Sequence, residues 1–366
     1  MPCQPTRAYE PIRIAIVGTG NVAAVHAAAL RTAGAGFAAA VDVDPGRLAA
    51  FTGAHGIPAA YGDVRDLLRE AVPDLVHICT PPRFHREQAL ACLRAGASVL
   101  TEKPPAISLR EFDELTAAEG AQGPWFATVF QHRFGSAQRR LKALTSAAPE
   151  VLGRPLLAIC HTTWFRDQAY FDVPWRGRWE TEGGGPTMGH GIHQMDMLLD
   201  ILGDWTEVRA LVRRQARRTQ TEDVSLAHVT FASGAVASVV NSVLSPRQES
   251  YLRFDFEHAT VEVTHLYGYG DDDWRVTPAP GHEDTVLTAW RPGNNVSSGH
   301  DAQFREVLRC LRDGIRPPVA PDQSRRTLAL TAAIYASAFG GQPVTRADLA
   351  PGMPFYEQMN GGVSPW

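Results

Sequence analysis

Two glycines near the start of the chain have the spacing needed to hold a dinucleotide. The motif G-T-G-N-V-A over residues 18–23 follows a strand-like apolar run and opens an Ala-rich, Pro-free segment. Gly18 allows a tight turn, and Gly20 lets the backbone approach a pyrophosphate. A helix that begins at Asn21 and Val22 would direct its N-terminal N–H groups at that anion. We therefore predict a Rossmann turn; the alternative is a glycine-rich turn without a ligand.

An acidic residue completes the dinucleotide pattern. Asp42 follows the next apolar run, residues 37–41, at the distance of about 20 residues from the glycines that the fingerprint requires. A carboxylate at this place accepts hydrogen bonds from both ribose hydroxyls of NAD and repels the 2′-phosphate of NADP. The sequence therefore predicts NAD as the cofactor, with NADP less favoured.

Further polar residues follow strand-like runs, where the ligands of a parallel sheet bind. They are Thr80 and Pro81, Glu102 and Lys103, and Gln131. Thr80 and Pro81 would pass beneath the nicotinamide ribose, to which Gln131 could hydrogen-bond. A lysine here can bind a substrate hydroxyl and relay its proton, helped by a desolvation that lowers its pKa. The alternative for a Lys-Pro pair is a solvated surface turn.

A second set of candidates lies in a glycine-rich segment far along the chain. After the glycines of residues 183–185, His190, His193 and Asp196 recur at intervals of three residues, which places them near one face of a helix. A His-x-x-His-x-x-Asp set can also look like a metal site. Because no fourth ligand accompanies these three residues, we expect no metal.

An aromatic and arginine-rich loop precedes that segment. It contains the candidates Trp164, Arg166, Tyr170, Trp175 and Arg176. Sugars present C–H faces that pack on aromatic rings and hydroxyls that suit arginine and indole N–H donors. We predict that these side chains form the substrate wall; the alternative is an ordinary core or interface loop. The two arginines also suit a carboxylate or phosphate on the substrate.

Length and patterning predict two domains that position these residues. A chain of 366 residues can bury two cores. Alternating strand-like and helix-like segments in the first third predict a parallel sheet with helices on both faces. Later, residues 223–231 and 235–243 flank a Ser-Gly turn, which is a hairpin signal. We expect an N-terminal tail over residues 1–10, an NAD-binding Rossmann domain over 11–133, and an α+β domain over 134–366 with a large open, mostly antiparallel sheet for substrate binding and oligomerisation.

Composition and charge exclude several other classes. The net charge of −4 gives no nucleic-acid or membrane-surface footprint, and no apolar run reaches the length of about 18 residues needed to span a bilayer. A basic stretch over residues 209–218 precedes Glu222 and Asp223, so we expect a solvated or subunit-contacting surface there. Without a secretory signal or a CxxC pair, we expect a cytoplasmic protein with free, mostly buried thiols. The cysteines are Cys3, Cys79, Cys92, Cys160 and Cys310.

In their order along the chain, these motifs resemble the Gfo/Idh/MocA family of oxidoreductases, which includes glucose–fructose oxidoreductase and inositol dehydrogenase. The segments that carry the resemblance are residues 18–23, Thr80-Pro81-Pro82 with His85, Glu102-Lys103-Pro104, and residues 183–185 leading to 191–196. The resemblance covers essentially the whole chain after Pro11. It implies hydride transfer between NAD or NADP and a secondary alcohol or ketone of a sugar, sugar derivative or cyclitol. It also implies a homodimer or homotetramer formed through the open sheet.

The resemblance also implies roles for single residues. Lys103 matches the family's essential lysine, and Glu102 matches a cofactor-side position. His193 matches the substrate-binding histidine, which makes it the candidate to exchange the hydroxyl proton. His85 matches a position near the cofactor, although a packed or helix-capping histidine is an equally good interpretation.

This chain departs from the family pattern at one important place. The family usually has an Asp four residues before the substrate-binding histidine, where this chain has Gly189. The change leaves room for a bulkier substrate, or lets His190 take over part of the role, while Asp196 would orient His193 or hold a substrate hydroxyl. Two alternatives to a dehydrogenase remain: an NAD-dependent glycosidase that acts by transient oxidation and elimination, and a non-catalytic NAD-binding sensor.

Overall fold

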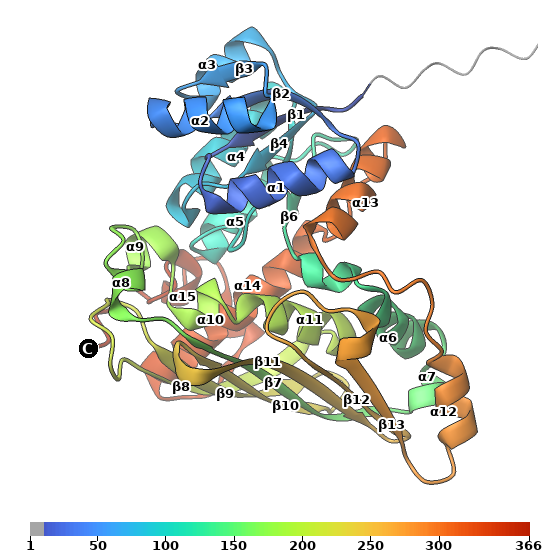
Figure 1. The fold of residues 1–366 in the computed structure, drawn as a ribbon. Coiled ribbons are helices and arrows are strands. Elements are labelled where there is room, and N and C mark those ends of the chain that lie inside the picture. Colours follow the sequence, from blue (N-terminus) through green and yellow to red (C-terminus); the bar gives the residue numbers. More distant parts are fainter. Residues whose placement is uncertain (1–10) are drawn as a thin grey trace, which may run out of the picture.

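The computed structural model describes residues 11–366, which form two domains built on separate sheets (Figure 1). The expected N-terminal tail, residues 1–10, and Cys3 lie outside the described residues. None of the helices within residues 11–366 has the length and apolar character needed to cross a bilayer. The described cysteines are free and buried, as expected: Cys79, Cys92, Cys160 and Cys310.

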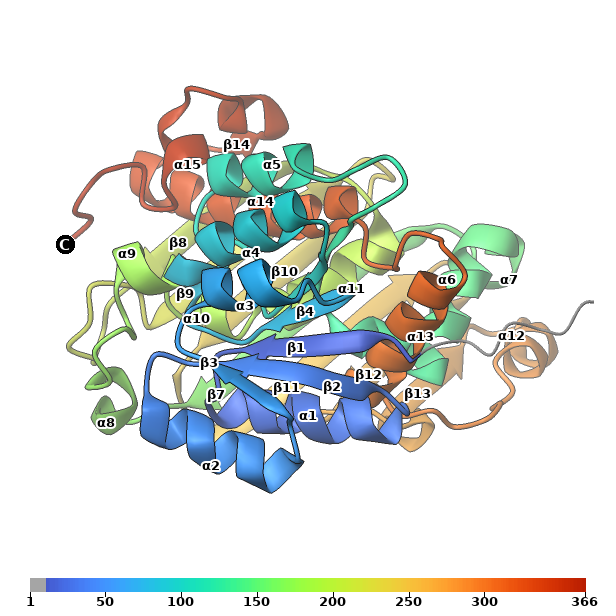
Figure 2. The same ribbon diagram turned by 90° about the horizontal axis from the view of Figure 1, so that it is seen from above.

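The first domain alternates strands and helices, and its sheet is parallel throughout. The strand order is β3-β2-β1-β4-β5-β6, and helices cover both faces of the sheet (Figure 2). Its elements are β1 (Arg13–Val17), α1 (Asn21–Thr32), β2 (Gly36–Val41), α2 (Pro45–His55), β3 (Ala59–Tyr61), α3 (Val64–Glu70), β4 (Leu75–Ile78), η1 (Pro82–Phe84), α4 (His85–Ala95), β5 (Ser98–Thr101), α5 (Leu109–Ala117), β6 (Phe126–Thr128) and η2 (Gln131–Phe134).

This strand order creates a crevice at the end of β1. β1 pairs with β2 on one side and with β4 on the other. The connection after β1 therefore leads to one side of the sheet and the connection after β4 leads to the other, and this reversal opens a ligand site at the strand ends. Gly18, directly after β1, has a φ of +87°, and a Cβ there would lie 2.9 Å from backbone atoms of Cys79 and Thr80. Glycine is therefore required for this turn to pack against the end of β4.

The second domain carries the predicted open sheet, in the order β13-β12-β11-β7-β10-β9-β8-β14. All neighbouring strands are antiparallel except β7 and β10, which run parallel. The strands are β7 (Pro155–Phe165), β8 (Trp205–Arg213), β9 (Val224–Phe231), β10 (Val236–Ser242), β11 (Leu244–Phe256), β12 (Ala259–Thr264), β13 (Trp274–Pro278) and β14 (Val344–Thr345).

The long helices of the second domain, apart from one at residues 300–312 that lies beside α1, lie on the sheet face that looks toward the first domain (Figure 1). Along β9 the residues alternate between buried and exposed, because one face packs on these helices. Leu226 and Val236 project from the opposite face and stay exposed. The helices are α6 (Ser136–Ala147), α7 (Pro149–Leu152), α8 (Gln168–Phe171), α9 (Trp179–Glu182), α10 (Pro186–Gly189), α11 (Ile192–Leu202), η3 (Asp271–Asp273), α12 (Glu283–Ala289), α13 (His300–Arg312), α14 (Pro321–Gly340), η4 (Arg346–Leu349) and α15 (Pro354–Glu357).

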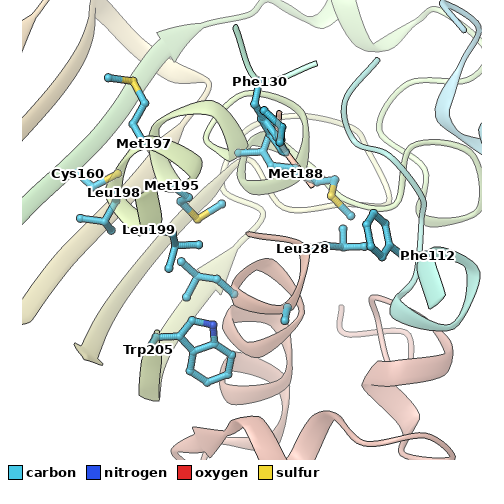
Figure 3. Packing of buried hydrophobic residues seen from close by; sticks show 14 of the residues in the cluster. Phe112, Phe130, Cys160, Met188, Met195, Met197, Leu198, Leu199, Trp205 and Leu328 are labelled. Carbon is cyan, nitrogen blue, oxygen red and sulfur yellow. The ribbon is translucent and has the colours of Figure 1, made fainter. Parts of the chain in front are cut away.

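Buried apolar side chains from both domains belong to one hydrophobic cluster. Figure 3 shows part of it: Phe112 of α5 lies close to Leu328 of α14, and Trp205 at the start of β8 belongs to the same cluster. In addition, α13 packs on α1, and its Phe304 belongs to the same apolar cluster as Leu30. The domains are therefore joined by packed contacts, which fix the walls of any site between them.

The glycine-rich segment differs from the expected single helix. The N–H groups of His190 and Gly191 both bond to the carbonyl of Pro186, at 3.0 and 2.7 Å. This arrangement closes α10 after Gly189, and α11 begins only at Ile192. His190 therefore lies in the break between two helices and does not share a helix face with His193.

A buried ion pair ties α11 to η2 and α14. The guanidinium of Arg133 donates to both carboxylate oxygens of Asp196, and Thr327 donates to the same carboxylate. The side chains of Arg133 and Asp196 are only 9% and 1% exposed. Desolvation makes such a pair costly to break, because removal of one partner leaves the other charge buried without compensation.

We expect replacement of Asp196 by Ala to lower the free energy of unfolding by about 3–5 kcal/mol, since the Arg133 charge would remain buried. Urea denaturation followed by circular dichroism measures this loss. The exposed pair of Arg154 and Glu257 provides the control, and Glu257→Ala should change stability far less. Equal losses in both variants would contradict this interpretation of the buried pair.

Candidate active site

One cavity of about 1020 Å³ is lined by residues of both domains at the carboxyl ends of the Rossmann strands. Most of the predicted site residues meet there. On the first-domain side the cavity is lined by Gly18, Gly20, Asn21, Val22, Asp42, Thr80, Pro81, Glu102 and Lys103. On the second-domain side it is lined by Trp164, Arg166, Tyr170, Trp175, Arg176, His190 and His193.

The first-domain end of the cavity fits a dinucleotide. Gly20 is the N-cap of α1, and a Cβ on Gly20 would meet no atom within 4 Å, so the space before the helix is open. Within residues 11–366, no side chain caps this helix. Its first backbone N–H groups are therefore available to a pyrophosphate, where the helix dipole also favours an anion.

Asp42 lies at the expected place, but it shares its carboxylate with protein donors. Its Oδ2 accepts from the N–H and the hydroxyl of Thr19 at 2.8 Å each, and its Oδ1 accepts from Arg47 at 2.9 Å. Partial burial opposes ionisation, but hydrogen bonds from Asp44, Thr19 and Arg47 hold the pKa of Asp42 below its usual value. Arg47 thus places a cation beside the carboxylate, and an arginine at this position can accommodate a 2′-phosphate.

Lys103 connects the two domains at the centre of the cavity. Its Nζ donates to the backbone carbonyl of Gly189 at 2.8 Å, across 86 residues of sequence. Burial lowers the pKa of the Lys103 ammonium, Glu102 and Glu182 counteract this effect, and Arg176 and Arg166 add to it. A lysine held in this state can exchange a proton closer to neutral pH than a solvated lysine can.

His193 faces the same cavity without a protein partner. Among the described residues, neither of its ring nitrogens has a hydrogen-bond partner, although the side chain is buried. Burial holds the pKa of His193 well below its usual value, and the Lys103 charge lowers it further. The ring is therefore neutral, with one nitrogen able to donate and the other able to accept. Buried polar atoms without partners are rare in proteins and indicate a place for a ligand.

The carboxylate of Glu102 lies beside two histidines. Its Oε1 lies 2.9 Å from Nε2 of His26 and 3.6 Å from Nε2 of His300. Burial would raise the pKa of Glu102, but the hydrogen bond to His26 and the nearby ring of His300 hold it well below its usual value. The ligand atoms of these three residues lie within 4.8 Å of one another, and a hydrogen bond joins two of the residues, His26 and Glu102. The charged carboxylate stands next to Lys103 and favours the ammonium form.

Glu182 is a site residue that the sequence analysis missed. It lines the cavity, and its Oε1 lies 3.6 Å from the place where a Cβ on Gly189 would stand. Burial raises the pKa of Glu182, whereas the N–H of Gly177 and the charges of Arg176 and Lys103 lower it. A carboxylate therefore lies beside Gly189, the position at which the family usually has an Asp. Its position next to the glycine run was the available signal.

The aromatic and arginine-rich loop forms one wall of the cavity. The guanidinium of Arg166 lies 5.0 Å from the ring centroid of Trp164, and that of Arg176 lies 4.0 Å from Tyr170 and 4.2 Å from Trp175. These contacts hold flat aromatic faces next to cationic donors. The wall can therefore offer both stacking surfaces and hydrogen bonds to a polar ligand.

His85 is not among the residues that line the cavity, but it contacts two that are, Thr80 and Pro104. Its Nδ1 contacts the carbonyl of Pro104 at 2.9 Å, and its Nε2 contacts the carbonyl of Thr80 at 2.7 Å. The ring thus crosslinks the two loops that carry Thr80 and Lys103. This geometry supports the packed-histidine interpretation, in which His85 positions the site without touching a ligand.

Gln131 and Asp196 are not among the residues that line the cavity, and protein partners bind the amide nitrogen of Gln131 and the carboxylate of Asp196. Gln131 donates to the hydroxyl of Tyr267, which itself lines the cavity. Asp196 binds Arg133, so it neither orients His193 nor reaches a substrate hydroxyl. Among the described residues, His190, His193 and Asp196 are not a group whose ligand atoms lie close enough together to hold a metal ion. His300 and Arg47 line the cavity as well, and nothing in the local sequence of His300 indicated this.

A dinucleotide cradle, a desolvated lysine and a neutral histidine in one cavity define a two-domain dehydrogenase or reductase. The model for the "Oxidoreductase family, NAD-binding Rossmann fold" matches residues 12–129, and the "GFO/IDH/MocA C-terminal domain" matches residues 141–264. The chain belongs to the Gfo/Idh/MocA family of oxidoreductases.

Relatives of the chain include named sugar dehydrogenases. D-glucoside 3-dehydrogenase of Escherichia coli (strain K12) is 32% identical over 285 residues, which cover 70% of this chain and 79% of that protein. D-apiose dehydrogenase of Paraburkholderia graminis is 26% identical over 98% of this chain and 96% of its own length. Among solved structures, the WlbA dehydrogenase from Bordetella pertussis, in complex with NADH and UDP-GlcNAcA, superimposes with a TM-score of 0.81 at 26% identity and covers 92% of this chain and 99% of its own.

We expect Glu182 to influence the pKa of Lys103. The Glu182 charge raises the pKa of Lys103, so Glu182→Gln should lower it. We expect the rise of kcat/KM with pH in alcohol oxidation to follow the deprotonation of Lys103, so this rise should then move to lower pH by on the order of one unit. Adding Gly189→Asp to this variant restores a carboxylate beside Lys103 and should move the rise back.

Steady-state kinetics across pH measures these shifts. Glu180→Gln, at an exposed position of the same short helix, is the matched control and should leave the profile unchanged. A profile that is identical in the wild type and in Glu182→Gln would contradict the proposed influence of Glu182 on the lysine.

Proposed function

We propose that this protein is an NAD-dependent oxidoreductase that transfers a hydride between nicotinamide and a secondary alcohol or ketone of a sugar, sugar derivative or cyclitol. The observation that carries the proposal is the shared cavity, in which Lys103 from the first domain and His193 from the second stand beside the dinucleotide cradle. Both side chains can hold or move a proton, and a hydroxyl that loses a hydride must also lose a proton.

The residues of the cavity would have different roles in alcohol oxidation. NAD, held by the turn at Gly18 and Gly20 and by Asp42, supplies the hydride acceptor when it is bound. Lys103 would contact the reacting hydroxyl through Nζ and take its proton. Neutral His193 would bind the same hydroxyl or its neighbour through a ring nitrogen and fix its direction. In the reductive direction, the ammonium of Lys103 would return the proton.

The wall of the cavity supports a sugar or cyclitol as the substrate. Trp164, Tyr170 and Trp175 offer aromatic faces for C–H groups, and Arg166 and Arg176 offer donors for hydroxyls. The names of the relatives point to the same class, since they include D-glucoside 3-dehydrogenase, D-apiose dehydrogenase and myo-inositol 2-dehydrogenase.

We expect Lys103→Ala to lower kcat by about 10²–10⁴-fold, because the general base is lost, while the affinity for NAD stays close to that of the wild type. Turnover of a panel of sugars and cyclitols, followed through NADH absorbance, gives kcat, and a titration of protein fluorescence gives the affinity. Lys142→Ala, on an exposed lysine of α6, is the control.

An unchanged kcat in Lys103→Ala would refute the assigned role of the lysine. Cleavage of a glycoside without net NADH formation would instead support the alternative of an NAD-dependent glycosidase. Failure of the wild type to reduce NAD with any member of the panel would favour a sensor.

We also propose NAD over NADP as the cofactor, since the charged Asp42 carboxylate lines the cavity and repels a 2′-phosphate. The wild type should bind NAD more tightly than NADP. Asp42→Ala should reduce this difference in affinity, because Arg47 would lose its carboxylate partner and could bind the 2′-phosphate of NADP. Calorimetric titration with each cofactor measures both dissociation constants. Equal or tighter binding of NADP by the wild type would count against Asp42 as the determinant.

We further propose that the protein forms a homodimer or homotetramer through the outer face of its open sheet. Apolar side chains stay exposed on this face, among them Leu157, Leu211, Leu226 and Val236, and an exposed apolar face of this kind is typical of an interface. Light scattering after gel filtration should show a dimer or larger, and Leu226→Lys should reduce the measured mass. A monomeric wild type would contradict this proposal.

A further inference from the structure

A second cavity, of about 490 Å³, adjoins the wall of the large cavity and is rich in arginine. It lies between Phe171 at the end of α8, the turn of residues 176–178, and the loop of residues 214–220 that joins β8 to β9. Its cationic lining residues are Arg176, Arg178, Arg214, Arg217 and Arg218, and none of its lining residues is acidic. Arg176 also lines the large cavity, so the two cavities meet at this residue.

The positive charges of the second cavity are largely uncompensated. Of its five arginines, only Arg176 pairs with a carboxylate within the described part of the chain, at 3.4 Å from Glu182. Arg214 donates to the carbonyl of Thr219, and Arg217 donates to the carbonyl of Arg166. Neutral carbonyls orient a guanidinium but leave its charge in place. These contacts therefore hold the arginines around the cavity without neutralising it.

The acidic residues that follow this loop in the sequence do not balance it. We expected Glu222 and Asp223 to accompany a solvated basic surface, but both are buried. Glu222 accepts from the backbone N–H groups of Gly185 and Thr187. Asp223 accepts from the backbone N–H groups of residues 215–217 and so shapes the arginine loop. The two carboxylates thus accept hydrogen bonds from backbone N–H groups and form no ion pair with the arginines of the cavity. The guanidinium groups therefore remain free to bind an external anion.

We infer that the second cavity binds a phosphate or diphosphate group carried by the substrate, whose reacting end occupies the large cavity. This inference rests on the proposed function and specifies its substrate as a sugar with a phosphate-bearing substituent distant from the oxidised carbon. A concave surface lined by one sign of charge concentrates counter-ions, and guanidinium groups match phosphate oxygens through paired N–H donors. Five arginines exceed what a single carboxylate would need.

Arg176 gives the reason for assigning both cavities to one ligand. Its guanidinium is held over the rings of Tyr170 and Trp175 in the substrate wall, and it also lines the second cavity. A sugar stacked on this wall would therefore present its substituent to Arg176 first, with Arg178 and Arg218 beyond. The exposed positions of Arg178 and Arg218 leave an opening through which a larger group, such as a nucleoside, can extend into solvent.

The first test is the binding of anions in the absence of turnover. Isothermal titration calorimetry of the NAD-saturated protein with inorganic pyrophosphate and with UDP should show binding that weakens as salt is added. The double variant Arg178→Gln/Arg218→Gln, which touches neither the dinucleotide cradle nor Lys103, should bind both probes at least about tenfold more weakly. Arg209→Gln/Arg213→Gln, on the neighbouring strand β8, makes the same change in net charge outside the cavity and should bind as the wild type does.

The second test compares substrates. For a sugar phosphate or a nucleoside-diphosphate sugar that is turned over, the Arg178→Gln/Arg218→Gln variant should show at least a tenfold higher KM, while its KM for a neutral methyl glycoside stays unchanged. Tighter binding of UDP than of pyrophosphate would identify the substrate as a nucleoside-diphosphate sugar. Equal affinities would assign a simpler sugar phosphate.

Three results would overturn the inference: no binding of either probe by the wild type, equal binding by the cavity variant, or an equal loss in the Arg209→Gln/Arg213→Gln control. A lower molar mass of the cavity variant in light scattering would also overturn it, because the arginines would then contact a second copy of the chain. Anion binding is measured without turnover, so it remains interpretable if the proposed oxidoreductase activity fails.

Discussion

The hydrogen bond from Lys103 to the carbonyl of Gly189 is the interaction on which the rest of the site depends. It joins the end of a Rossmann strand to the second domain, and it directs the ammonium across the cavity between them. A charged donor makes a stronger hydrogen bond than a neutral one, and the shared hydrophobic core behind it prevents the domains from separating. His85 supports the same arrangement by contacting the carbonyl that follows Lys103 and the loop at Thr80.

Desolvation at this junction sets the protonation states that the chemistry needs. Burial lowers the pKa of both Lys103 and His193, and the lysine charge lowers that of His193 further. Glu102 and Glu182 act in the opposite direction on the lysine, so its proton affinity results from a balance of burial and nearby carboxylates. A neutral imidazole beside a poised ammonium can bind a hydroxyl without adding a second positive charge to the cavity.

The parts of the site that follow local rules could be predicted from the sequence. The glycine turn, Asp42 and Lys103 each stand at the end of a strand, and the parallel topology brings such ends together. The role expected for Asp196 was wrong because its partner, Arg133, lies 63 residues away in the sequence, and no local pattern reports an ion pair at that distance. The arginine cavity was missed for the same reason, since backbone contacts of Glu222 and Asp223 from a different segment shape that region.

The central claim is that an ammonium from the first domain and an imidazole from the second converge on one alcohol beside a nicotinamide ring. A crystal structure of the protein with NADH and a sugar that it binds tests this claim most directly. The account predicts one ring hydroxyl within hydrogen-bond distance of both Nζ of Lys103 and a ring nitrogen of His193, next to the nicotinamide. A nicotinamide bound away from Lys103, or a sugar whose hydroxyls contact neither side chain, would contradict it.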